Sequence, residues 1–550
     1  MSSTPPSDPE ISDKADPGTS ALAPLALPVF RMLWFTWLAA NISMWMNDVA
    51  AAWLMTSLTT SPVLVALVQT ASTLPVFLLG LPSGALADIL DRKKFFLFTQ
   101  LWVAVVALAL CATVLSGWMS PMLLLAMTFA NGIGLALRWP VFSAIVPELV
   151  PRHQLPAALA LNGVSMNASR IVGPLVAGAL IASLGSAYVF MLNAALATVA
   201  AVIISRWKRT PTPQPLGREK LLSAIRVGMQ FMGQSAHLQG VLVRICLFFF
   251  HSTALIALLP LVARGLPGGD ARTFTLLLAC MGAGAIVAAL NMQRLRRYWS
   301  RDGLVFRGAA LQSLSMVVVA FAPHTTVAAL AMVVAGMAWI TTANTLSVSA
   351  QFALPDWVRA RGMSMYQMAI MGASASGAAI WGQVASHYEI RGSLVVAAIT
   401  GVITMGLANR WMADSQTEED LTPTRLFKVP QPKQPPGAGR VVLTIEYRID
   451  PARADEFKEL MRVSRRGRLR HGALSWDLLR DINDPGLFIE QIVDESWTEH
   501  LRRFDRVTTA DATLRDRKHA FHIGTEPPVV RRRIVESVHG TDSARTMPDA

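Results

Sequence analysis

Two charged residues, Asp48 and Arg170, lie inside long apolar segments of the sequence. Asp48 is the carboxylate of the first apolar segment, and Arg170 lies about thirteen residues, or roughly 20 Å of helix, into the fifth. A charge near the middle of a bilayer costs about 2.5 to 3.5 kcal/mol on insertion scales and usually faces the interior of a helix bundle. We therefore expect the two side chains to lie near each other. They form either a site for a proton, a cation or a substrate, or a static buried pair.

A third residue that could carry a proton is His251, which lies about twelve residues into the seventh apolar segment. Histidine changes its charge near neutral pH, so it could join Asp48 and Arg170 as a coupling residue. A neutral histidine that is hydrogen-bonded in the core explains the same position equally well.

A dense charge cluster, GALADILDRKK, separates the second apolar segment from the third. It contains Gly84, Asp88, Asp91, Arg92 and Lys93. Basic residues keep a loop on the cytoplasmic side of a membrane, whereas acidic residues contribute little to that retention. The aspartates therefore need another role, either pairing with the neighbouring bases or capping an adjacent helix. If such contacts form in one state and break in another, Asp88 in particular would act as a latch.

The fifth apolar segment carries small and polar residues along one helical face, because their spacing is three or four residues. The face consists of Gly163, Asn167, Arg170, Pro174 and Gly178, and Gly173 precedes the proline. Small residues let helices approach closely in lipid. The pattern indicates a tight packing seam with a proline kink, or a motif that takes part in transport.

The elements that position these residues are apolar helices. The 550-residue chain is 53% hydrophobic and only 15% charged, whereas soluble proteins carry roughly a quarter charged residues. About 20 apolar residues cross a bilayer. Breaks at charges, Pro and Gly predict twelve spans near 31–57, 63–87, 95–116, 121–147, 157–184, 187–207, 238–263, 273–294, 304–322, 325–350, 362–386 and 391–412.

Loop charges and a repeat order these spans. Lys and Arg collect in the connections after even-numbered spans and are missing after spans 1, 3 and 5. This places both termini in the cytoplasm. The sequence PELV at 147–150 closes span 4, and PDWV at 355–358 closes span 10. The same offset of 208 residues also aligns the basic loop after span 2 with the basic loop after span 8. The two matches predict a duplication into two six-helix halves, a recurring plan of transporters.

The last part of the chain has a soluble character. After a proline-rich stretch, alternating and amphipathic segments follow in the order strand, helix, strand, strand, helix. This order fits a ferredoxin-like domain, which often dimerises through its sheet. Trp476, Trp497 and His500 are candidates for a pocket in it, although Trp in a small core is usually structural.

Several function classes are excluded by what the sequence lacks. It has no glycine-rich phosphate loop, no HExxH and no nucleophile elbow. Cys111, Cys246 and Cys280 stand in apolar segments at unrelated spacings, so neither disulfides nor a metal site are expected. The net charge of +13 does not indicate nucleic acid, because the excess lies in the apolar part of the chain. We expect no enzyme activity, no metal and no cofactor.

The charge cluster resembles the cytoplasmic loop motif of the major facilitator superfamily, matched by Gly84, Asp88 and the bases from Arg92 on. Two positions depart from that motif: Ile89 replaces a common base, and Asp91 a common glycine. The Gly173-Pro174 pair resembles the antiporter motif, with the closing glycine displaced to Gly178.

Nearly the whole chain resembles one branch of this superfamily, the enterobactin-exporter or transmembrane secretion effector type. Its soluble tail is similar to antibiotic-biosynthesis monooxygenase domains. The stretches that carry the resemblance are PELVPRHQLPAALALNG, RIVGPLVAG, VVLTIEYRIDPARADEF and ESWTEHLRRFDR. The resemblance implies export of small amphipathic molecules, such as siderophores, antibiotics or drugs, across the cytoplasmic membrane by alternating access. Proton antiport is the implied energy source.

The partners expected are the cargo, protons and the lipid bilayer, with possible dimerisation through the last domain and no nucleic acid. The alternative function is a membrane-tethered enzyme or ligand sensor whose C-terminal domain carries the main activity. The expected parts are a disordered tail, two helical halves separated by a linker, a proline-rich linker, a ferredoxin-like domain and a second tail: 1–28, 29–207, 208–237, 238–412, 413–439, 440–536 and 537–550.

Overall fold

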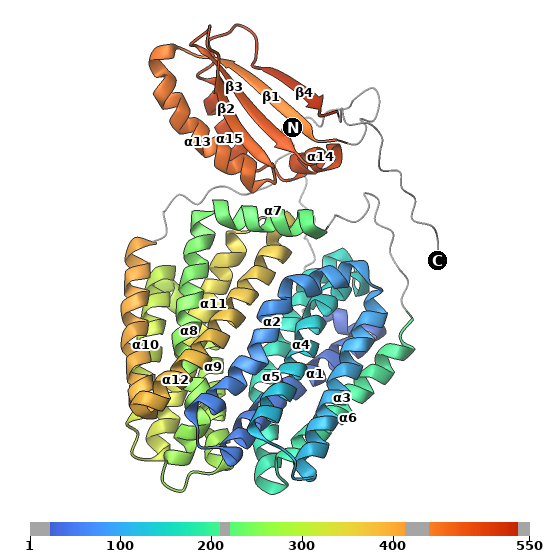
Figure 1. Ribbon diagram of the computed structural model, residues 1–550, viewed down its shortest axis with the longest axis vertical. Coiled ribbons are helices and arrows are strands. Elements are labelled where there is room, and N and C mark those ends of the chain that lie inside the picture. The colour runs from blue at the N-terminus through green and yellow to red at the C-terminus, as the bar shows by residue number, and fades with distance from the viewer. Residues whose placement is uncertain (1–21, 209–220, 413–438, 537–550) are drawn as a thin grey trace, which may run out of the picture.

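The computed structural model describes residues 22–208, 221–412 and 439–536. The final tail, nearly all of the proline-rich linker and most of the first tail lie outside these ranges. Figure 1 shows two helical groups side by side and a smaller domain, built on a sheet, at one end of them. We call that end of the helices the sheet end, and the opposite end the far end.

The first helical group holds six helices that begin and end alternately at the two ends. They are α1 (Pro28–Leu58), α2 (Pro62–Ile89), α3 (Arg92–Leu115), α4 (Pro121–Leu149), α5 (Leu155–Ser183) and α6 (Ser186–Arg206). Helix α1 packs against α5, α2 against α4, and α3 against α6. Pro28, Pro62 and Pro121 occupy first helical positions, where proline has a preset backbone angle and its missing N–H is not needed.

The second group repeats this plan after a short amphipathic helix. It consists of α7 (Leu221–Gln234), α8 (Ala236–Gly265), α9 (Ala271–Tyr298), α10 (Arg301–Ala320), α11 (Thr325–Phe352) and α12 (Asp356–Trp411). Helix α12 breaks at Tyr388 and Glu389, and Glu389 has a φ of 61°. The break falls between the predicted spans 362–386 and 391–412.

Ten helices of the described chain are long and apolar enough to cross a membrane. They are α2 to α6 and α8 to α12, with α12 counted once. Helix α1 is not among the ten, although it is 31 residues long.

The two groups share one apolar core toward the far end and have separate cores at the sheet end. One apolar cluster unites Met46 and Met55 of the first group with Leu258, Phe274 and Met332 of the second, all in the far half of their helices. At the sheet end, each group has a core of its own. This arrangement closes the space between the groups toward the far end.

The smaller domain is a four-stranded antiparallel sheet in the order β2-β3-β1-β4. Its elements are β1 (Val441–Arg448), α13 (Ala454–Arg470), β2 (Ser475–Arg480), β3 (Leu487–Asp494), α14 (Trp497–Asp505), α15 (Thr509–His519) and β4 (Val529–Ile534). The chain order of these elements contains the strand, helix, strand, strand, helix order that the sequence predicts. Its core gathers Phe457, Tyr447, Phe488 and Ile492.

Three details differ from the sequence prediction. Residues 23–26, expected in a disordered tail, form a 3₁₀ turn, η1 (Ala23–Ala26), that packs against α1 and α5 because Pro24 is buried there. The linker between the halves contains α7, whose Val227 and Phe231 are buried. The last domain gains the helix α15 and the strand β4, and β4 completes the sheet beside β1.

Candidate functional site

A cavity of about 110 Å³ lies where the two helical groups meet, and its two walls differ in character. The first group contributes every charged and amide side chain of the lining. These residues are Asp48, Gln69 and Arg170, joined by Ser72 and Trp45. The second group contributes apolar and aromatic residues and glycine: Ile256, Ala257, Phe274, Leu278, Met281, Gly282, Ala285, Gly336 and Trp339.

Asp48 and Arg170 share the cavity, but each has a neutral neighbour. The Ser72 hydroxyl donates a hydrogen bond of 2.9 Å to Asp48 Oδ1. The Arg170 guanidinium lies 5.4 Å from the centre of the Trp45 ring, a distance at which a cation is attracted by an aromatic face. Within the described residues no ion pair joins Asp48 to Arg170, and Arg170 Nε has no hydrogen-bond partner. The arrangement leaves both charges available to a bound molecule.

The small residues of α5 have different neighbours. A Cβ on Gly173 would lie 2.5 Å from Trp45 Cβ, so this glycine lets α5 approach α1. A Cβ on Gly178 would overlap Thr275 of α9, so that glycine lets the two groups touch. Pro174 lines the cavity. The face therefore serves packing and also carries Arg170 into the cavity, while the Asn167 side chain lies outside the described part.

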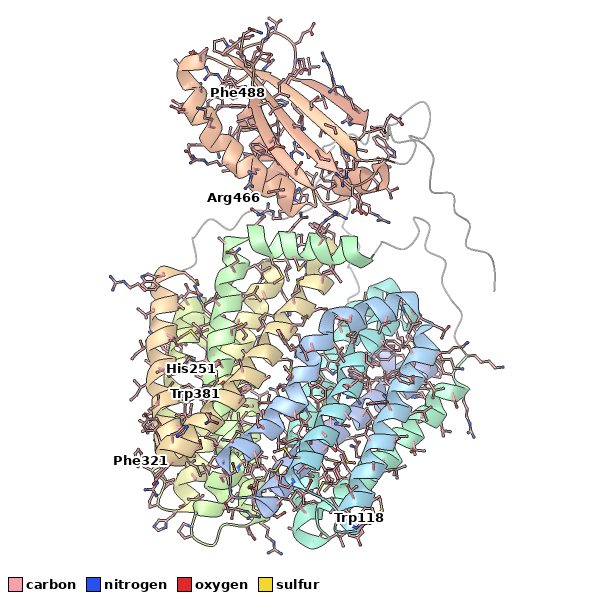
Figure 2. All side chains as sticks on the ribbon, viewed as in Figure 1. Trp118, His251, Phe321, Trp381, Arg466 and Phe488 are labelled. Carbon is pink, nitrogen blue, oxygen red and sulfur yellow. The ribbon has the colours of Figure 1, made fainter. Side chains whose placement is uncertain are left out.

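His251 lies apart from this cavity, in the interior of the second group. Its Nδ1 is 2.7 Å from the Leu247 carbonyl oxygen, one turn back along α8. Its ring lies 5.7 Å from the Trp381 ring. Figure 2 labels the two residues within the second helical group. This is the position of a hydrogen-bonded core histidine.

The charge cluster between α2 and α3 is tied to the first group at the sheet end. Asp91 caps α3 by accepting a 2.9 Å hydrogen bond from the Lys94 backbone N–H. Arg92 forms a 2.6 Å ion pair with Glu148 at the end of α4. Lys93 donates to the Ser205 carbonyl of α6 at 2.8 Å. Gly84 and Asp88 lie in the last turns of α2, and the Asp88 side chain lies outside the described part.

Sequence reasoning missed Ser72 and the apolar wall of the cavity. Ser72 stands three residues after Gln69, a spacing that places both on one helical face. This spacing could have predicted that Ser72 faces the same space as Gln69. Phe274 and Leu278 had no such signal, because an apolar residue in an apolar helix looks the same whether it faces lipid or a cavity.

The three pocket candidates of the last domain belong to two separate polar clusters. Trp476 Nε1 donates a 3.0 Å hydrogen bond to the fully buried Glu490. His500 Nδ1 lies 2.6 Å from Asp494 Oδ2, and its ring lies 5.2 Å from Trp497. Burial lowers the pKa of His500, with the Asp494 contact acting in the opposite direction.

The Glu490 cluster is saturated with donors. Lys518 Nζ lies 3.1 Å and Ser464 Oγ 2.9 Å from its carboxylate. Burial would raise the pKa of Glu490, but the neighbouring Lys518 and Arg468 hold it well below its usual range. Burial also lowers the pKa of Lys518 to about 8. A carboxylate with so many partners is a structural centre of the domain.

Comparisons with known proteins agree on the kind of molecule. Residues 19–539 match the family model described as transmembrane secretion effector. The uncharacterised MFS-type transporter YfiS of Bacillus subtilis is 28% identical over 43% of this chain, and the match spans 56% of YfiS, so the chain matches only about half of that relative. The staphyloferrin A transporter of Staphylococcus aureus is 21% identical over 50% of the chain and 70% of its own length. The enterobactin exporter EntS of Shigella flexneri is 25% identical over 52% and 67%.

Solved structures agree on the fold. A bacterial homologue of the lysosomal transporter Spinster, in an inward-facing and occupied conformation, has a TM-score of 0.57 and 15% identity over 70% of this chain and 97% of its own. A point mutant of the nucleoside transporter NupG has a TM-score of 0.56 and 12% identity over 70% and 99%. At these identities the likeness concerns the fold alone.

Proposed function

The chain belongs to the transmembrane secretion effector family of major facilitator transporters. We propose that it exports small amphipathic molecules in exchange for protons. Its relatives and fold neighbours are membrane transporters, not enzymes. Its relatives include the staphyloferrin A transporter, the enterobactin exporter and the macrolide efflux protein A of Streptococcus pyogenes. Those cargoes support an amphipathic substrate class for this chain.

We propose twelve spans with both termini in the cytoplasm. The count adds α1 to the ten candidate helices and divides α12 at Tyr388. Arg92, Lys93 and Arg206 lie at the sheet end, where retained basic loops mark the cytoplasmic side. On this orientation the far end is the outer end, and the shared apolar cluster there supports a state that opens toward the cytoplasm.

The observation that carries the proposal is the two-sided cavity. The polar part of a cargo would meet Asp48, Gln69 and Arg170, and its apolar part would meet Phe274 and Trp339. Asp48, held by one serine and facing the cavity, is the site proposed for the exchanged proton. Cargo and proton would then compete for the polar wall that contains Asp48. Such competition couples the export of cargo to the import of a proton.

A cargo screen followed by matched variants tests this function. Cells that lack the gene are tested for gained sensitivity to siderophores, antibiotics and dyes, and the compound with the largest effect is used in proteoliposomes. Asp48→Asn should abolish transport driven by a pH gradient. Asp270→Asn is the control, because Asp270 caps α9 without lining the cavity and Asn is an equally good cap.

Two results would contradict the proposal. One is a screen without any effect although the protein is inserted in the membrane. The other is a pH-driven rate that Asp48→Asn leaves unchanged.

The alternative, in which the last domain carries the main activity, has a direct test. Deleting residues 413–550 should retain cargo efflux on the transporter account. Complete loss of efflux from a correctly inserted protein would favour the alternative. The saturation of Glu490 and Asp494 by their own neighbours supports a non-catalytic domain.

A further inference from the structure

The last domain is packed onto the second helical group by a specific interface. Arg226 of α7 forms a 2.7 Å ion pair with Glu495, just after β3. One turn along α7, Gln230 Nε2 donates a 3.2 Å hydrogen bond to the Ala473 carbonyl. Figure 1 shows the domain resting above α7 at the sheet end.

Trp357, the second residue of α12, is the centre of this interface. The Arg506 guanidinium of the domain lies 5.1 Å from its ring centre. The His471 ring meets it edge-on at 6.3 Å, and the Phe231 ring of α7 meets it at 5.7 Å. Arg506 is itself fixed by a 2.8 Å hydrogen bond to the His471 carbonyl. One tryptophan thus joins α7, α12 and the domain.

The approach of the two surfaces is close. Gly472 has a φ of +102°, a backbone conformation that favours glycine. A Cβ there would lie 2.9 Å from a methyl carbon of Val227 on α7. Val227 and Ala473 are fully buried and His471 is 3% exposed. This is a packed contact and not a loose tether.

The helix held by the domain also forms the seam between the two halves. Along α12, Gly372 packs against Phe77 of α2, and Thr70 of α2 donates a 2.8 Å hydrogen bond to the Ala375 carbonyl. On α7, Gly228 lies beside Met365 of the same α12 segment. Alternating access requires α12 to move relative to α2, so a contact at the start of α12 is placed to influence that movement.

We propose that the last domain is a regulatory clamp, which docks on α7 and Trp357 and stabilises the arrangement that is open at the sheet end. The inference rests on alternating access as the proposed function. A domain that binds one arrangement better than the other shifts the equilibrium by the ratio of its affinities. The docked domain occurs here with the halves joined at the far end, so its release favours closure of the sheet end.

The test uses a cysteine reporter in the full chain. Gly163 lies two turns into α5 on the face of Arg170 and Pro174, and a Cβ there meets nothing within 4 Å. In a background where Cys111, Cys246 and Cys280 are replaced by Ala, Gly163→Cys is labelled by a membrane-impermeant maleimide added at the sheet end. Labelling is fast when this end is open. Neither cargo nor a pH gradient is needed, so failure of the clamp is distinguishable from failure of transport.

Charge reversal at the ion pair gives the comparison. Arg226→Glu and Glu495→Arg should each slow labelling by roughly fivefold, the lower range of typical coupling between sites. The double variant should recover most of the rate, because it restores opposite charges. Arg462→Glu is the control, since its ion pair with Glu459 is exposed on α13 away from the interface.

A disulfide lock makes the outcome decisive. Gln230→Cys with Ala473→Cys joins the two surfaces at their hydrogen bond, and its formation reports docking directly. Labelling is read at position 163 alone, by mass spectrometry of the peptide that contains it, because the reduced pair also reacts with maleimide. Oxidising the pair in the Arg226→Glu variant should restore fast labelling at position 163, whereas reduction should slow it again. Labelling that does not respond to the lock, or to single reversals that release the domain, would overturn the clamp.

Discussion

The charged side chains of the helical bundle and those of the last domain differ in their partners. In the bundle, Asp48 and Arg170 face a shared cavity without an ion pair between them in the described structure. In the domain, Glu490 is buried with Lys518, Arg468 and Ser464 around its carboxylate. Charges available to a ligand indicate a working site, and saturated charges indicate a structural centre. The following changes test that distinction, from the largest expected effect to the smallest.

Removing the charge at the centre of the domain should cost the most stability. Glu490→Gln leaves Lys518 and Arg468 buried without their anion, and breaking a buried pair costs about 3–5 kcal/mol. The free energy of unfolding of the domain, followed by pulse proteolysis of the full chain, should fall by that amount. Adding Lys518→Met should recover part of it, because Arg468 is then the one charge left of the three in the cluster. No loss of stability in Glu490→Gln would mean that the cluster is not structural.

Removing the cation of the cavity should affect transport instead. Hydrogen bonds to charged groups are worth about 1.5–3 kcal/mol, so Arg170→Gln should reduce transport of an anionic or strongly polar cargo by roughly 10- to 100-fold. The free energy of unfolding should change little, because no acidic side chain in the described part of the chain forms an ion pair with Arg170. A large loss of stability with normal transport would mean that Arg170 stabilises the fold and does not bind the cargo.

The apolar wall should contribute affinity but not coupling. Trp339→Ala removes aromatic area from the cavity, and at about 25 cal/mol per Å² a partial loss of contact corresponds to about 1 kcal/mol, or fivefold in cargo affinity. Cargo binding by detergent-solubilised protein measures this change. Proton coupling should be unaffected. Its loss in this variant would contradict the assignment of proton exchange to the polar wall and of apolar cargo contact to the opposite wall.

The smallest effect should come from lowering the pH by half a unit. Burial lowers the pKa of His471 to about 4, with the nearby Asp511 opposing and Arg470, Arg468 and Arg503 adding to the shift. The folded domain therefore binds fewer protons than the unfolded chain between pH 6.5 and 4. Its stability falls as pH decreases through that range, by roughly 1.4 kcal/mol per pH unit at most.

His471→Gln is the control for this slope. It should flatten the dependence of the unfolding free energy on pH in that range, apart from a residual slope from His500 and His519, whose pKa values are also lowered by burial. An unchanged slope in His471→Gln would remove this residue from the account.

The sequence predicted the helices well, because apolar length and proline positions are local properties. The predicted gap between the last two segments coincides with the break at Tyr388 and Glu389. Helix α7 was hidden in a predicted linker, since a short amphipathic helix gains its stability from packing, here through Phe231 and Val227. Strand β4 was missed because its Arg531, Arg532 and Arg533 resemble a solvated charged run.

One wall of the cavity could be predicted from the sequence and the other could not. Asp48 and Arg170 stood out because a charge among apolar residues is rare. The opposite wall is invisible in a single sequence, because Leu278 or Met281 in one apolar helix resembles any other apolar residue. For His251 the sequence left a coupling role and a core role open, and its hydrogen bond to the Leu247 carbonyl favours the core role.

The most direct test of the central proposal compares two kinds of transport in the Asp48→Asn variant. Proteoliposomes containing the full chain are loaded with the cargo from the screen, and the rate driven by a pH gradient is measured beside cargo exchange without a gradient. The account predicts that Asp48→Asn loses the gradient-driven rate and retains exchange, while Asp270→Asn keeps both. Gradient-driven transport at the wild-type rate in Asp48→Asn would contradict it.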